Sequence, residues 1–461
     1  MIRMFKHYIP NAVLALALVD FILLLSAADL AWRIRTYQIG SAPGEWGARV
    51  IELLVFGVTV FAATAAVGGY SVQALQSIRF ATARLLVAVS LAVIGISVID
   101  LVLPGELLWR SILLYAMLIA IAFLIANRLI LGPLLGTSRF QRRILVLGAG
   151  ARAERLAKLA RRSGSGFLIT SFVAMSDAEV RVERAIARQD IADLGRHVDR
   201  TRAGEVVLAL EERRNSLPLK DLLRIKTRGV PVVDFSSFIE RETGRVDLDT
   251  LNPSWLIFSD GFSSSRLLSS VAKRSFDILV SAALLLAAAP MILLFALLIR
   301  LESPGPAFFR QTRIGLYGQP FVLAKLRSMR RDAEAGGAQW AQKNDPRVTR
   351  IGRLIRTIRV DELPQCWNVL KGEMSFVGPR PERPPFVVAL EEQLPYYAER
   401  HMVKPGITGW AQINYPYGAS IEDAREKLEY DLYYAKNYTP FLDILILLQT
   451  LRVILWSEGA R

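Results

Sequence analysis

The most informative stretch of the chain is Arg356-Thr-Ile-Arg-Val-Asp-Glu-Leu-Pro-Gln-Cys-Trp-Asn-Val-Leu-Lys-Gly-Glu-Met-Ser-Phe-Val-Gly-Pro-Arg-Pro381. Two adjacent carboxylates, Asp361 and Glu362, stand among cationic side chains and shortly before Pro364. Because proline is tolerated in the first turn of a helix, the pair is expected at a helix N-terminus, where anionic groups such as phosphates are favoured. A carboxylate nucleophile, a second carboxylate for a metal ion and several arginines together predict a phosphoryl-transfer site.

The composition indicates a membrane protein. Of the 461 residues, 52% are hydrophobic, and the formal net charge is +15. Apolar runs with a basic remainder favour a membrane protein that faces anionic headgroups or anionic substrates. Nucleic acid would also explain the charge, but the sequence has no recognition motif, and no nucleic-acid partner is expected. Cys366 is the only cysteine, which rules out an internal disulfide and a cysteine zinc cluster and leaves a hard cation held by oxygen ligands.

Four apolar stretches open the chain, at 11–32, 50–69, 84–104 and 107–131. Each approaches or exceeds the ~20 residues that a spanning helix needs, so residues 1–135 are predicted to form a bundle of four transmembrane helices. Asp20 and Asp100 lie within these runs and are expected to face another helix or an interface. The positive-inside rule places the segments before the first stretch, between the second and third, and after the fourth in the cytoplasm. Their basic residues are Arg3, Lys6, His7, Arg79, Arg84, Arg128, Arg139, Arg142 and Arg143.

Residues 140–262 are predicted to form a Rossmann-like α/β domain. A buried strand is expected at 143–147, followed by a glycine turn and an amphipathic helix, with further strands at 167–175, 205–210 and 230–234. Gly148 and Gly150 are placed to approach a pyrophosphate, and Ala153 replaces the third glycine of the dinucleotide-binding pattern. No acidic residue is securely placed at the end of a second strand. Nucleotide binding and a purely structural glycine turn both stay open.

A second membrane element is predicted at 275–300. The apolar run Ile278–Ile299 is long enough to cross, but Pro290 interrupts it and is expected to kink the helix. Basic residues flank both ends, which favours the same, cytoplasmic side for each. We therefore expect a re-entrant helix that enters one leaflet and returns. The alternative is a fifth ordinary span.

The C-terminal part of the chain carries ordered polar motifs. They are Lys273-Arg-Ser-Phe-Asp277, Asn344-Asp-Pro-Arg-Val-Thr-Arg350, Asp361-Glu-Leu-Pro-Gln365, Asn368–Pro381, Pro405-Gly-Ile-Thr-Gly-Trp-Ala-Gln412 and Leu428-Glu-Tyr-Asp-Leu-Tyr-Tyr434. Through these blocks, residues 272–458 resemble the bacterial sugar transferases called polyprenyl-phosphate glycosyl-1-phosphate transferases. The whole chain resembles the large form of that family: four spans, a Rossmann-like domain and, over 272–461, a mostly α catalytic domain. That form includes initiators of exopolysaccharide and O-antigen synthesis.

The resemblance implies an enzyme and its chemistry. A sugar-1-phosphate would move from a UDP-sugar to undecaprenyl phosphate with release of UMP, at the cytoplasmic face of a bacterial inner membrane. In this family the aspartate of the Asp-Glu pair is the nucleophile, which maps to Asp361, and the glutamate, here Glu362, is associated with Mg²⁺. Glucose or galactose is the expected sugar, and N-acetylated sugars stay open. A homo-oligomer, most simply a dimer, is the expected assembly.

Further residues complete the predicted substrate site. The family's phosphate-binding arginines map to Arg356 and Arg380 and its lysine to Lys325, and we add Arg327 and Asp345. Each has an ordinary structural alternative. Arginines are usually solvated surface charges, and an aspartate before a proline often forms an Asx-turn. The same holds for the dyad, which by itself would serve as a helix cap or complement a helix dipole.

Two other functions are compatible with four spans and an α/β domain. One is an NAD-dependent nucleotide-sugar dehydratase, and the other is a membrane scaffold without catalytic activity. The sequence contains no Tyr-x-x-x-Lys pair, and its glycine pattern is degenerate, which counts against the dehydratase. The intact Asp-Glu and Gly-Pro-Arg-Pro blocks count against the scaffold.

Overall fold

The computed structural model describes most of the chain. The described residues are 2–4, 7–9, 11–41, 44–70, 78–102, 110–135, 141–161, 165–175, 180–211, 217–251, 267–331, 333, 345–416, 418 and 420–456. The chain divides into two compact units, of which the first ends at Thr243 and the second begins at Gly244. The domain boundary predicted at residue 262 lies outside the described residues and stays a prediction.

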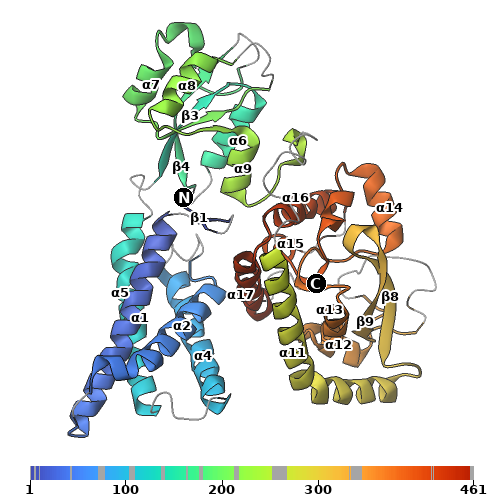
Figure 1. Ribbon diagram of the computed structural model, residues 1–461. Helices are drawn as coiled ribbons and strands as arrows, with labels where there is room; N and C mark the ends of the chain where they lie inside the picture. Colours follow the sequence, from blue (N-terminus) through green and yellow to red (C-terminus); the bar gives the residue numbers. More distant parts are fainter. Residues whose placement is uncertain are drawn as a thin grey trace. The chain divides into compact units, whose positions relative to one another are not determined.

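Four helices open the first unit (Figure 1). They are α1 (Asn11–Gln38), α2 (Val50–Ala66), α4 (Ile78–Val102) and α5 (Arg110–Leu135), and they share one apolar core. α1, α4 and α5 are each long and apolar enough to cross a membrane, whereas α2, with 17 residues, is shorter. The second span is shorter than predicted because the chain leaves the helix at Val67, and the Gly69 N–H then donates to the Thr64 carbonyl in a turn.

A buried ion pair links the first and last of these helices. Arg128 of α5 donates to both carboxylate oxygens of Asp20 on α1, at 3.0 and 2.7 Å, and Asn127 adds a hydrogen bond of 2.7 Å. The side chains of Asp20 and Arg128 are 0% and 2% exposed, so this acid faces a partner helix, as expected. Arg84 is also buried, and it donates to the Gly68 carbonyl at 2.7 Å. The prediction that counted Arg84 and Arg128 as loop charges is therefore wrong for these two residues.

The rest of the first unit is built on a parallel sheet. Its strands are β3 (Arg142–Leu147), β4 (Phe167–Ala174), β5 (Ala185–Ala187), β6 (Glu205–Leu208) and β7 (Val232–Asp234), in the order β5-β4-β3-β6-β7. The strands predicted from apolar runs are present. β5 was not foreseen, because a strand of three residues is too short to give a periodic signal. The strand order reverses between β3 and β6, which is where open α/β sheets bind ligands.

Helices cover both faces of this sheet. They are α6 (Ala151–Ala160), α7 (Leu194–Thr201), α8 (Leu219–Thr227) and α9 (Phe235–Thr243). Alternate residues of a strand point to opposite faces. Ile144 and Val146 of β3 therefore pack with α6 and α9, whereas Leu145 and Leu147 pack with α7 and α8. The sheet is therefore parallel and covered by helices on both faces.

The second unit contains a short 3-10 helix, η4 (Leu248–Thr250), and its first described α-helix is α11 (Leu267–Glu302), which has 36 residues. It contains Pro290 and runs as two arms joined by a bend (Figure 1). A proline inside a helix removes one backbone hydrogen bond and pushes against the preceding turn, which accounts for a bend in a continuous helix. Large apolar side chains are exposed along its length, namely Leu279, Leu286, Leu293, Leu297 and Leu301. The part Ser270–Glu302 is long and apolar enough to cross a membrane.

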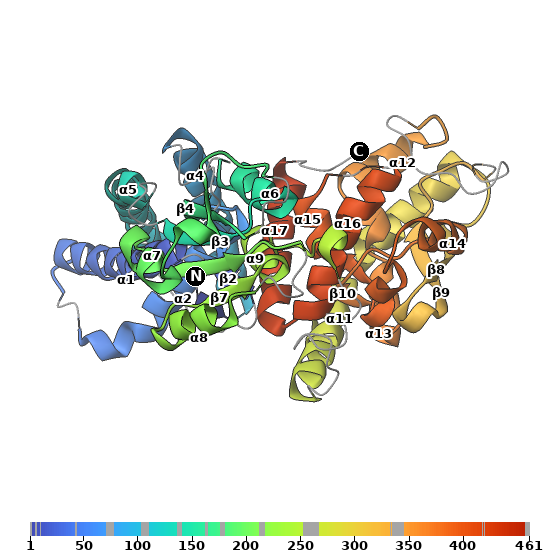
Figure 2. The same ribbon diagram turned by 90° about the horizontal axis from the view of Figure 1, so that it is seen from above.

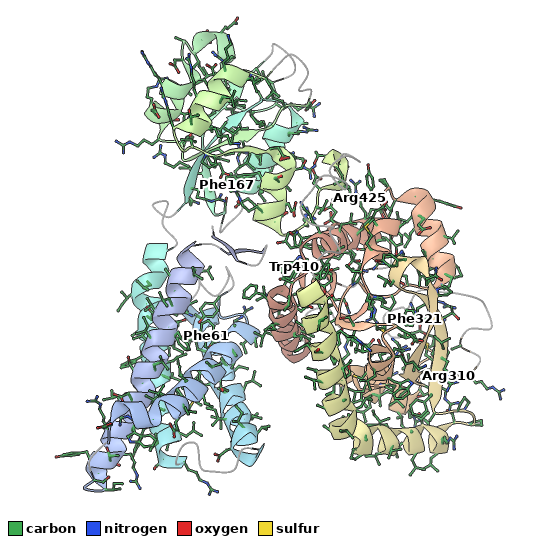
Figure 3. The ribbon with its side chains drawn as sticks, viewed as in Figure 1. Phe61, Phe167, Arg310, Phe321, Trp410 and Arg425 are labelled. Atoms are coloured by element: carbon green, nitrogen blue, oxygen red, sulfur yellow. The ribbon has the colours of Figure 1, made fainter. Side chains whose placement is uncertain are left out.

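The elements after α11 enclose an apolar core. They are β8 (Phe308–Ile314), η5 (Leu316–Gly318), β9 (Pro320–Leu326), α12 (Arg350–Thr357), η6 (Val360–Glu362), α13 (Gln365–Lys371), β10 (Ser375–Val377), α14 (Pro384–Gln393), η7 (Ala398–Met402), β11 (Gly406–Thr408), α15 (Trp410–Asn414), α16 (Ile421–Asn437) and α17 (Pro440–Trp456). β8 and β9 form an antiparallel hairpin, and β10 and β11 pair in parallel. The hairpin lies on the opposite side of this unit from α15, α16 and α17 (Figures 1 and 2). In Figure 3, Phe321 of β9 lies inside, whereas Arg310 of β8 points outward.

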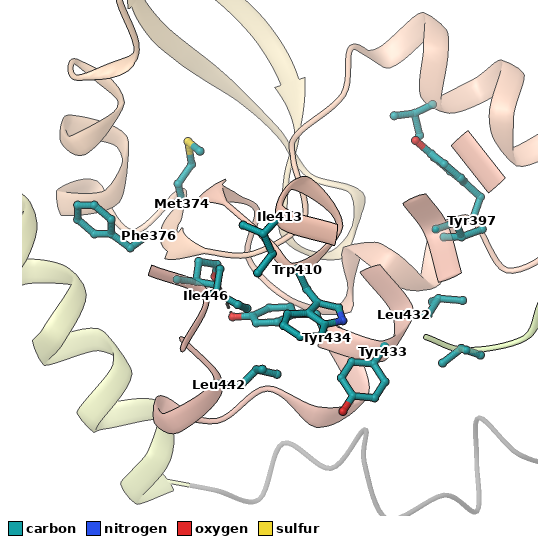
Figure 4. Close-up of a cluster of buried hydrophobic side chains, with 14 of the residues drawn as sticks. Met374, Phe376, Tyr397, Trp410, Ile413, Leu432, Tyr433, Tyr434, Leu442 and Ile446 are labelled. Atoms are coloured by element: carbon teal, nitrogen blue, oxygen red, sulfur yellow. Dashed lines mark hydrogen bonds between the residues drawn. The ribbon is translucent and has the colours of Figure 1, made fainter. Parts of the chain in front are cut away.

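Aromatic side chains form the centre of this core (Figure 4). Trp410 of α15 stacks on Tyr433 of α16 with ring centroids 5.9 Å apart. Leu442 and Ile446 of α17 are fully buried against the same cluster, while Ile444 is 51% exposed. α17 is therefore held in the core by one face. Trp410 belongs to this core as well.

Candidate active site

The two adjacent carboxylates lie where three short helical segments follow one another. α12 precedes them, Asp361 and Glu362 belong to η6, and α13 begins at Gln365. Arg359, just before η6, has a φ of 60°, which is the left-handed conformation. Such a conformation costs about 1 kcal/mol or more for a residue with a side chain. The dyad precedes a helix, as predicted, but a sharp turn at Arg359 sets its direction.

Asp361 is a buried carboxylate with an unpartnered oxygen. The residue is 7% exposed, and within the described part of the chain its Oδ1 has no hydrogen-bond partner. Burial, reinforced by the charge of Glu362, raises the pKa of Asp361 to about 6 against the opposing effect of Lys325, Arg356 and Arg359. Because buried polar groups are nearly always hydrogen-bonded, an oxygen placed in this way is suited to a bound ligand.

Glu362, in contrast, is paired with two cations. Its Oε1 accepts hydrogen bonds from Lys325 Nζ at 3.2 Å and Arg380 Nη2 at 2.9 Å. Burial alone would raise the pKa of Glu362, but Arg380 and Lys325 outweigh it and hold that pKa well below the usual range. Burial lowers the pKa of Lys325, and the Glu362 carboxylate opposes this effect. Residues from β9, η6 and the loop after β10 thus form a charged cluster beside Asp361.

Two further arginines act on the dyad. Arg356 and Arg359 both lower the pKa of Asp361, and Arg359 also lowers that of Glu362. The Arg356 side chain is oriented by Ser328, whose Oγ accepts from its Nε at 2.9 Å. The structure therefore brings the predicted residues Lys325, Arg356 and Arg380 together around the dyad. Arg359, whose direction the sequence leaves open, also acts on both carboxylates. Ser328 is a further residue that the sequence did not single out.

Two other predicted substrate residues are engaged elsewhere. Both Nη atoms of Arg327 donate to backbone carbonyls at and just after the end of α11, at 2.8 to 3.3 Å. Asp345 accepts hydrogen bonds from the backbone N–H and the guanidinium of Arg347, at 2.6 to 3.0 Å. The second arrangement is the Asx-type turn that the sequence left as an alternative. The contacts give Arg327 and Asp345 structural roles, and substrate binding by either residue stays a prediction.

Arg380 lies in a loop, 379–382, in which each backbone carbonyl is held by a different donor. The carbonyls of Pro379 and Glu382 accept from the backbone N–H groups of Gly406 (2.9 Å) and Ile314 (3.0 Å). The carbonyls of Arg380 and Pro381 accept from the side chains of Arg400 (Nη2, 3.0 Å) and Arg313 (Nη1, 3.0 Å). The donors come from β8, η7 and β11. The side chain of Arg380 therefore extends toward Glu362 from a fixed stretch of main chain.

The dyad offers the oxygen ligands that Mg²⁺ prefers. Among the described residues, no three His, Cys, Asp or Glu side chains form a group that could hold a metal ion. Mg²⁺, however, is usually bound by one or two carboxylates together with substrate phosphates and water. Asp361 provides an unpartnered oxygen next to Glu362. The residues thus fit a Mg²⁺ ion that shares its coordination with a phosphate ligand.

Backbone atoms and a carboxylate of the same unit lie close to the glycine turn at Gly148 and Gly150. Gly148 has a φ of 127°, and a Cβ there would lie 2.5 Å from the Ala209 carbonyl oxygen, so packing alone requires glycine. α6 begins after Gly150, and the N–H of Ala151 donates to the Glu211 carboxylate at 2.9 Å. A carboxylate therefore stands where a pyrophosphate would bind in a dinucleotide site. Nucleotide binding at Gly148 and Gly150 stays a prediction.

Comparison with known proteins places this site in a family. Residues 268–457 match the family model described as bacterial sugar transferase. The UDP-N-acetylgalactosamine-undecaprenyl-phosphate N-acetylgalactosaminephosphotransferase of Aeromonas hydrophila is 44% identical over 240 residues, which are 52% of this chain and 56% of the relative. The UDP-glucose:undecaprenyl-phosphate glucose-1-phosphate transferase of Caulobacter vibrioides is 41% identical over 197 residues, 42% of this chain and 74% of the relative. The exopolysaccharide production protein PSS of Rhizobium leguminosarum is 44% identical over 186 residues, 39% of this chain and 93% of the relative.

The similarity lies in the part of the chain that carries the site. The chain spans about half the length of the Aeromonas relative, 56%, and most of the length of the Rhizobium one, 93%. The residues matched by the family model include the dyad and the four cations gathered around it, Lys325, Arg356, Arg359 and Arg380. The chain belongs to the bacterial sugar transferase family.

Proposed function

We propose that the protein transfers a sugar-1-phosphate from a UDP-sugar to undecaprenyl phosphate, which yields UMP and undecaprenyl-diphosphate-sugar. The observation that carries the proposal is the buried, unpartnered Oδ1 of Asp361 among cationic side chains. The names of the relatives, which specify glucose or N-acetylgalactosamine, support the substrate classes. Glucose, galactose and N-acetylgalactosamine are the candidate sugars.

In the first step the Asp361 carboxylate attacks the phosphorus that carries the sugar. A bond forms between Asp361 and this phosphorus, the bond from the phosphorus to the bridging oxygen breaks, and UMP leaves with the electron pair. Arg380 and Lys325 lie beside Glu362 and are placed to bind the phosphate oxygens, for which a guanidinium is well suited. Fixed cations of this kind stabilise charge that develops in the transition state.

In the second step a phosphate oxygen of the lipid attacks the same phosphorus. The bond to Asp361 breaks, its carboxylate is regenerated, and the new diphosphate links lipid and sugar. A covalent intermediate suits a site that receives two phosphate-linked substrates in turn. A bound Mg²⁺ would neutralise charge on the phosphates during both displacements. Glu362, with Asp361 Oδ1 beside it, would hold this ion.

We also propose that α11 is a hairpin in the cytoplasmic leaflet of a bacterial inner membrane. The bend in α11 and the basic residues at its two ends, Arg274 and Arg300, support a return to the same side. Val360, the residue before Asp361, belongs to the same apolar cluster as Ile292 and Phe295 of α11. The neighbour of the proposed nucleophile thus packs in one cluster with α11, which supports attack by a lipid phosphate at the membrane surface. Synthesis of an exopolysaccharide, O-antigen or capsule would begin with the product.

Trapping the intermediate tests the proposal. The full-length protein in nanodiscs is incubated with UDP-glucose, UDP-galactose or UDP-N-acetylgalactosamine and Mg²⁺, without lipid acceptor, and the quenched protein is digested for mass spectrometry. A sugar-phosphate adduct is expected on the peptide containing Asp361 and absent from Asp361→Asn, and undecaprenyl phosphate is expected to discharge it. Turnover without any adduct would refute the covalent route. Failure to release UMP from all three donors would refute the function.

A further inference from the structure

A buried arginine lies directly behind Arg380. Arg400 belongs to η7 and is 5% exposed. Its Nη2 donates to the carbonyl oxygen of Arg380 at 3.0 Å, while Nη2 of Arg380 donates to Glu362 at 2.9 Å. One residue therefore connects Arg400 to the dyad. Since the main chain of Arg380 sets where its side chain starts, a shift at Arg400 is transmitted to the guanidinium at Glu362.

Arg400 is itself fixed by two buried groups. Its Nε and Nη2 donate to Oδ2 of Asp431 on α16 at 3.0 and 2.7 Å, and its Nη1 donates to the Tyr397 hydroxyl at 2.8 Å. Asp431 and Tyr397 are 2% and 3% exposed. A guanidinium carries its donors in a rigid planar fork. Because the Arg400 guanidinium is bound to Asp431 and Tyr397, the direction in which its Nη2 donates to the Arg380 carbonyl is fixed.

We propose that Arg400 is a positioning residue for the reaction. Held by Tyr397 and Asp431, it fixes the main chain of Arg380 so that the Arg380 guanidinium meets Glu362 and the donor phosphate. This inference rests on the proposed function, in which Arg380 binds phosphate. The loop needs outside support because Arg380 is flanked by Pro379 and Pro381, which have no N–H to donate. Displacement of such a ligand by about 1 Å is enough to slow a reaction severely.

A double-mutant cycle separates positioning from general stability. Arg400→Lys keeps the charge opposite Asp431 but loses the planar fork. In the wild-type background it is expected to lower the initial rate of UMP release about tenfold. In the Arg380→Lys background the guanidinium at Glu362 is already gone, so Arg400→Lys is expected to lower the rate less than about twofold. Full-length protein in nanodiscs is used, and the melting temperature of each variant is recorded.

Arg245→Lys is the matched control. Arg245 pairs with Glu426 and with Glu429, the latter at 3.3 Å, on the same helix α16 that carries Asp431. Its substitution weakens an ion pair to α16 without touching the Arg380 loop. It is therefore expected to change the rate by the same factor in both backgrounds.

Two outcomes would overturn the positioning role. One is an Arg400→Lys variant with wild-type activity, and the other is an equal loss in both backgrounds. If Arg400→Lys unfolds at the assay temperature, Tyr397→Phe takes its place in the double-mutant cycle. This substitution removes only the hydroxyl that accepts from Nη1 of Arg400. Its loss is expected to be about threefold in the wild type and absent with Arg380→Lys. An unaltered protein that releases no UMP would instead refute the proposed function.

Discussion

Glu362 Oε1 accepts hydrogen bonds from two cations, whereas Oδ1 of its neighbour Asp361 accepts none from the described residues. The difference separates the two carboxylates electrostatically. Burial and the charge of Glu362 raise the pKa of Asp361 to about 6, while Arg380 and Lys325 overcome burial and hold the pKa of Glu362 well below the usual range. Groups whose environments push their pKa values apart commonly have different roles in one site. Here the less stabilised carboxylate is the proposed nucleophile.

The first half-reaction should follow the ionisation of Asp361. Because only the carboxylate attacks phosphorus, the rate of UMP release is expected to rise about tenfold per pH unit below about pH 6 and to level off above about pH 7. Burial and Arg400 lower the pKa of His401 to about 4, so His401 does not titrate in this window.

The pH dependence is best measured as a single turnover without lipid acceptor, since a phosphate monoester also titrates near about pH 6. Saturating donor and Mg²⁺ keep binding from limiting the rate. A rate that stays constant down to about pH 5 would show that Asp361 is ionised throughout and would contradict the assigned pKa.

Asp361 is expected to lower stability at neutral pH. Its folded pKa of about 6 lies above the unfolded value, so folding disfavours the carboxylate. The penalty is at most about 3 kcal/mol above about pH 6, and it disappears as the pH falls through the unfolded pKa near about 4. Asp361→Asn is therefore expected to melt at a higher temperature than the wild type at neutral pH and to lose this advantage in acid.

Thermal unfolding of the full-length protein at several pH values checks this expectation. Glu392→Gln is the control, because Glu392 is an exposed acid on α14, and its effect is expected to be small at every pH. A lower melting temperature for Asp361→Asn at neutral pH would contradict the predicted sign.

Removal of divalent cations should stop UMP release. EDTA is expected to abolish it and added Mg²⁺ to restore it. Glu362→Gln is expected to raise the Mg²⁺ concentration for half-maximal rate by about tenfold or more, because the carboxylate that would hold the ion is gone. Asp345→Asn serves for comparison, since Asp345 is held by Arg347, and it should leave the Mg²⁺ requirement unchanged. If Glu362→Gln reached half-maximal rate at the same Mg²⁺ concentration as the wild type, Glu362 would not be the Mg²⁺ ligand.

Breaking the ion pair of the front helices should destabilise them strongly. Asp20→Asn leaves the Arg128 guanidinium buried without its counter-charge, and a loss of about 3–5 kcal/mol is expected. The double variant Asp20→Leu with Arg128→Leu is expected to recover most of this loss, since apolar residues often replace a buried pair at little cost. Unfolding in detergent is the measurement. Ser90→Ala on α4, which removes an exposed hydroxyl bonded to its own helix, is the control. Equal stability of Asp20→Asn and this control would refute the role of the pair.

Local pattern was enough to find the long apolar helices, four of the five strands of the parallel sheet and the dyad. Asp361 and Glu362 stand out because two acids among arginines before a proline form a rare combination, and apolar runs mark α1 and α11. The family resemblance pointed to Lys325, Arg356 and Arg380, which lie around the dyad, but the sequence did not separate Arg327 from them. Arg327 resembles Lys325 in position and charge. Its guanidinium nevertheless binds at the end of α11, where it donates to the backbone carbonyls of Pro304 and Ile299, which precede it by 23 and 28 residues.

Contacts between distant residues decide the remaining assignments. Arg128 looks like a cytoplasmic loop charge until Asp20, 108 residues earlier, is seen to pair with it. Gly148 and Gly150 stay a predicted phosphate-binding turn, but the sequence gives no sign that Glu211, 60 residues after Ala151, lies at the start of α6. The sequence does not indicate the proposed role of Arg400, because its guanidinium binds the backbone carbonyl of Arg380, a group that every residue type has. Such contacts depend on how the elements pack and not on local spacing.

The buried pair between Asp20 and Arg128 constrains how the chain is made. Ribosomes synthesise the carboxylate first, and the guanidinium follows 108 residues later. A buried arginine without its counter-charge is costly. The ion pair can therefore form only after α5 has been synthesised. Until then α1 must remain accessible, and the bundle closes last.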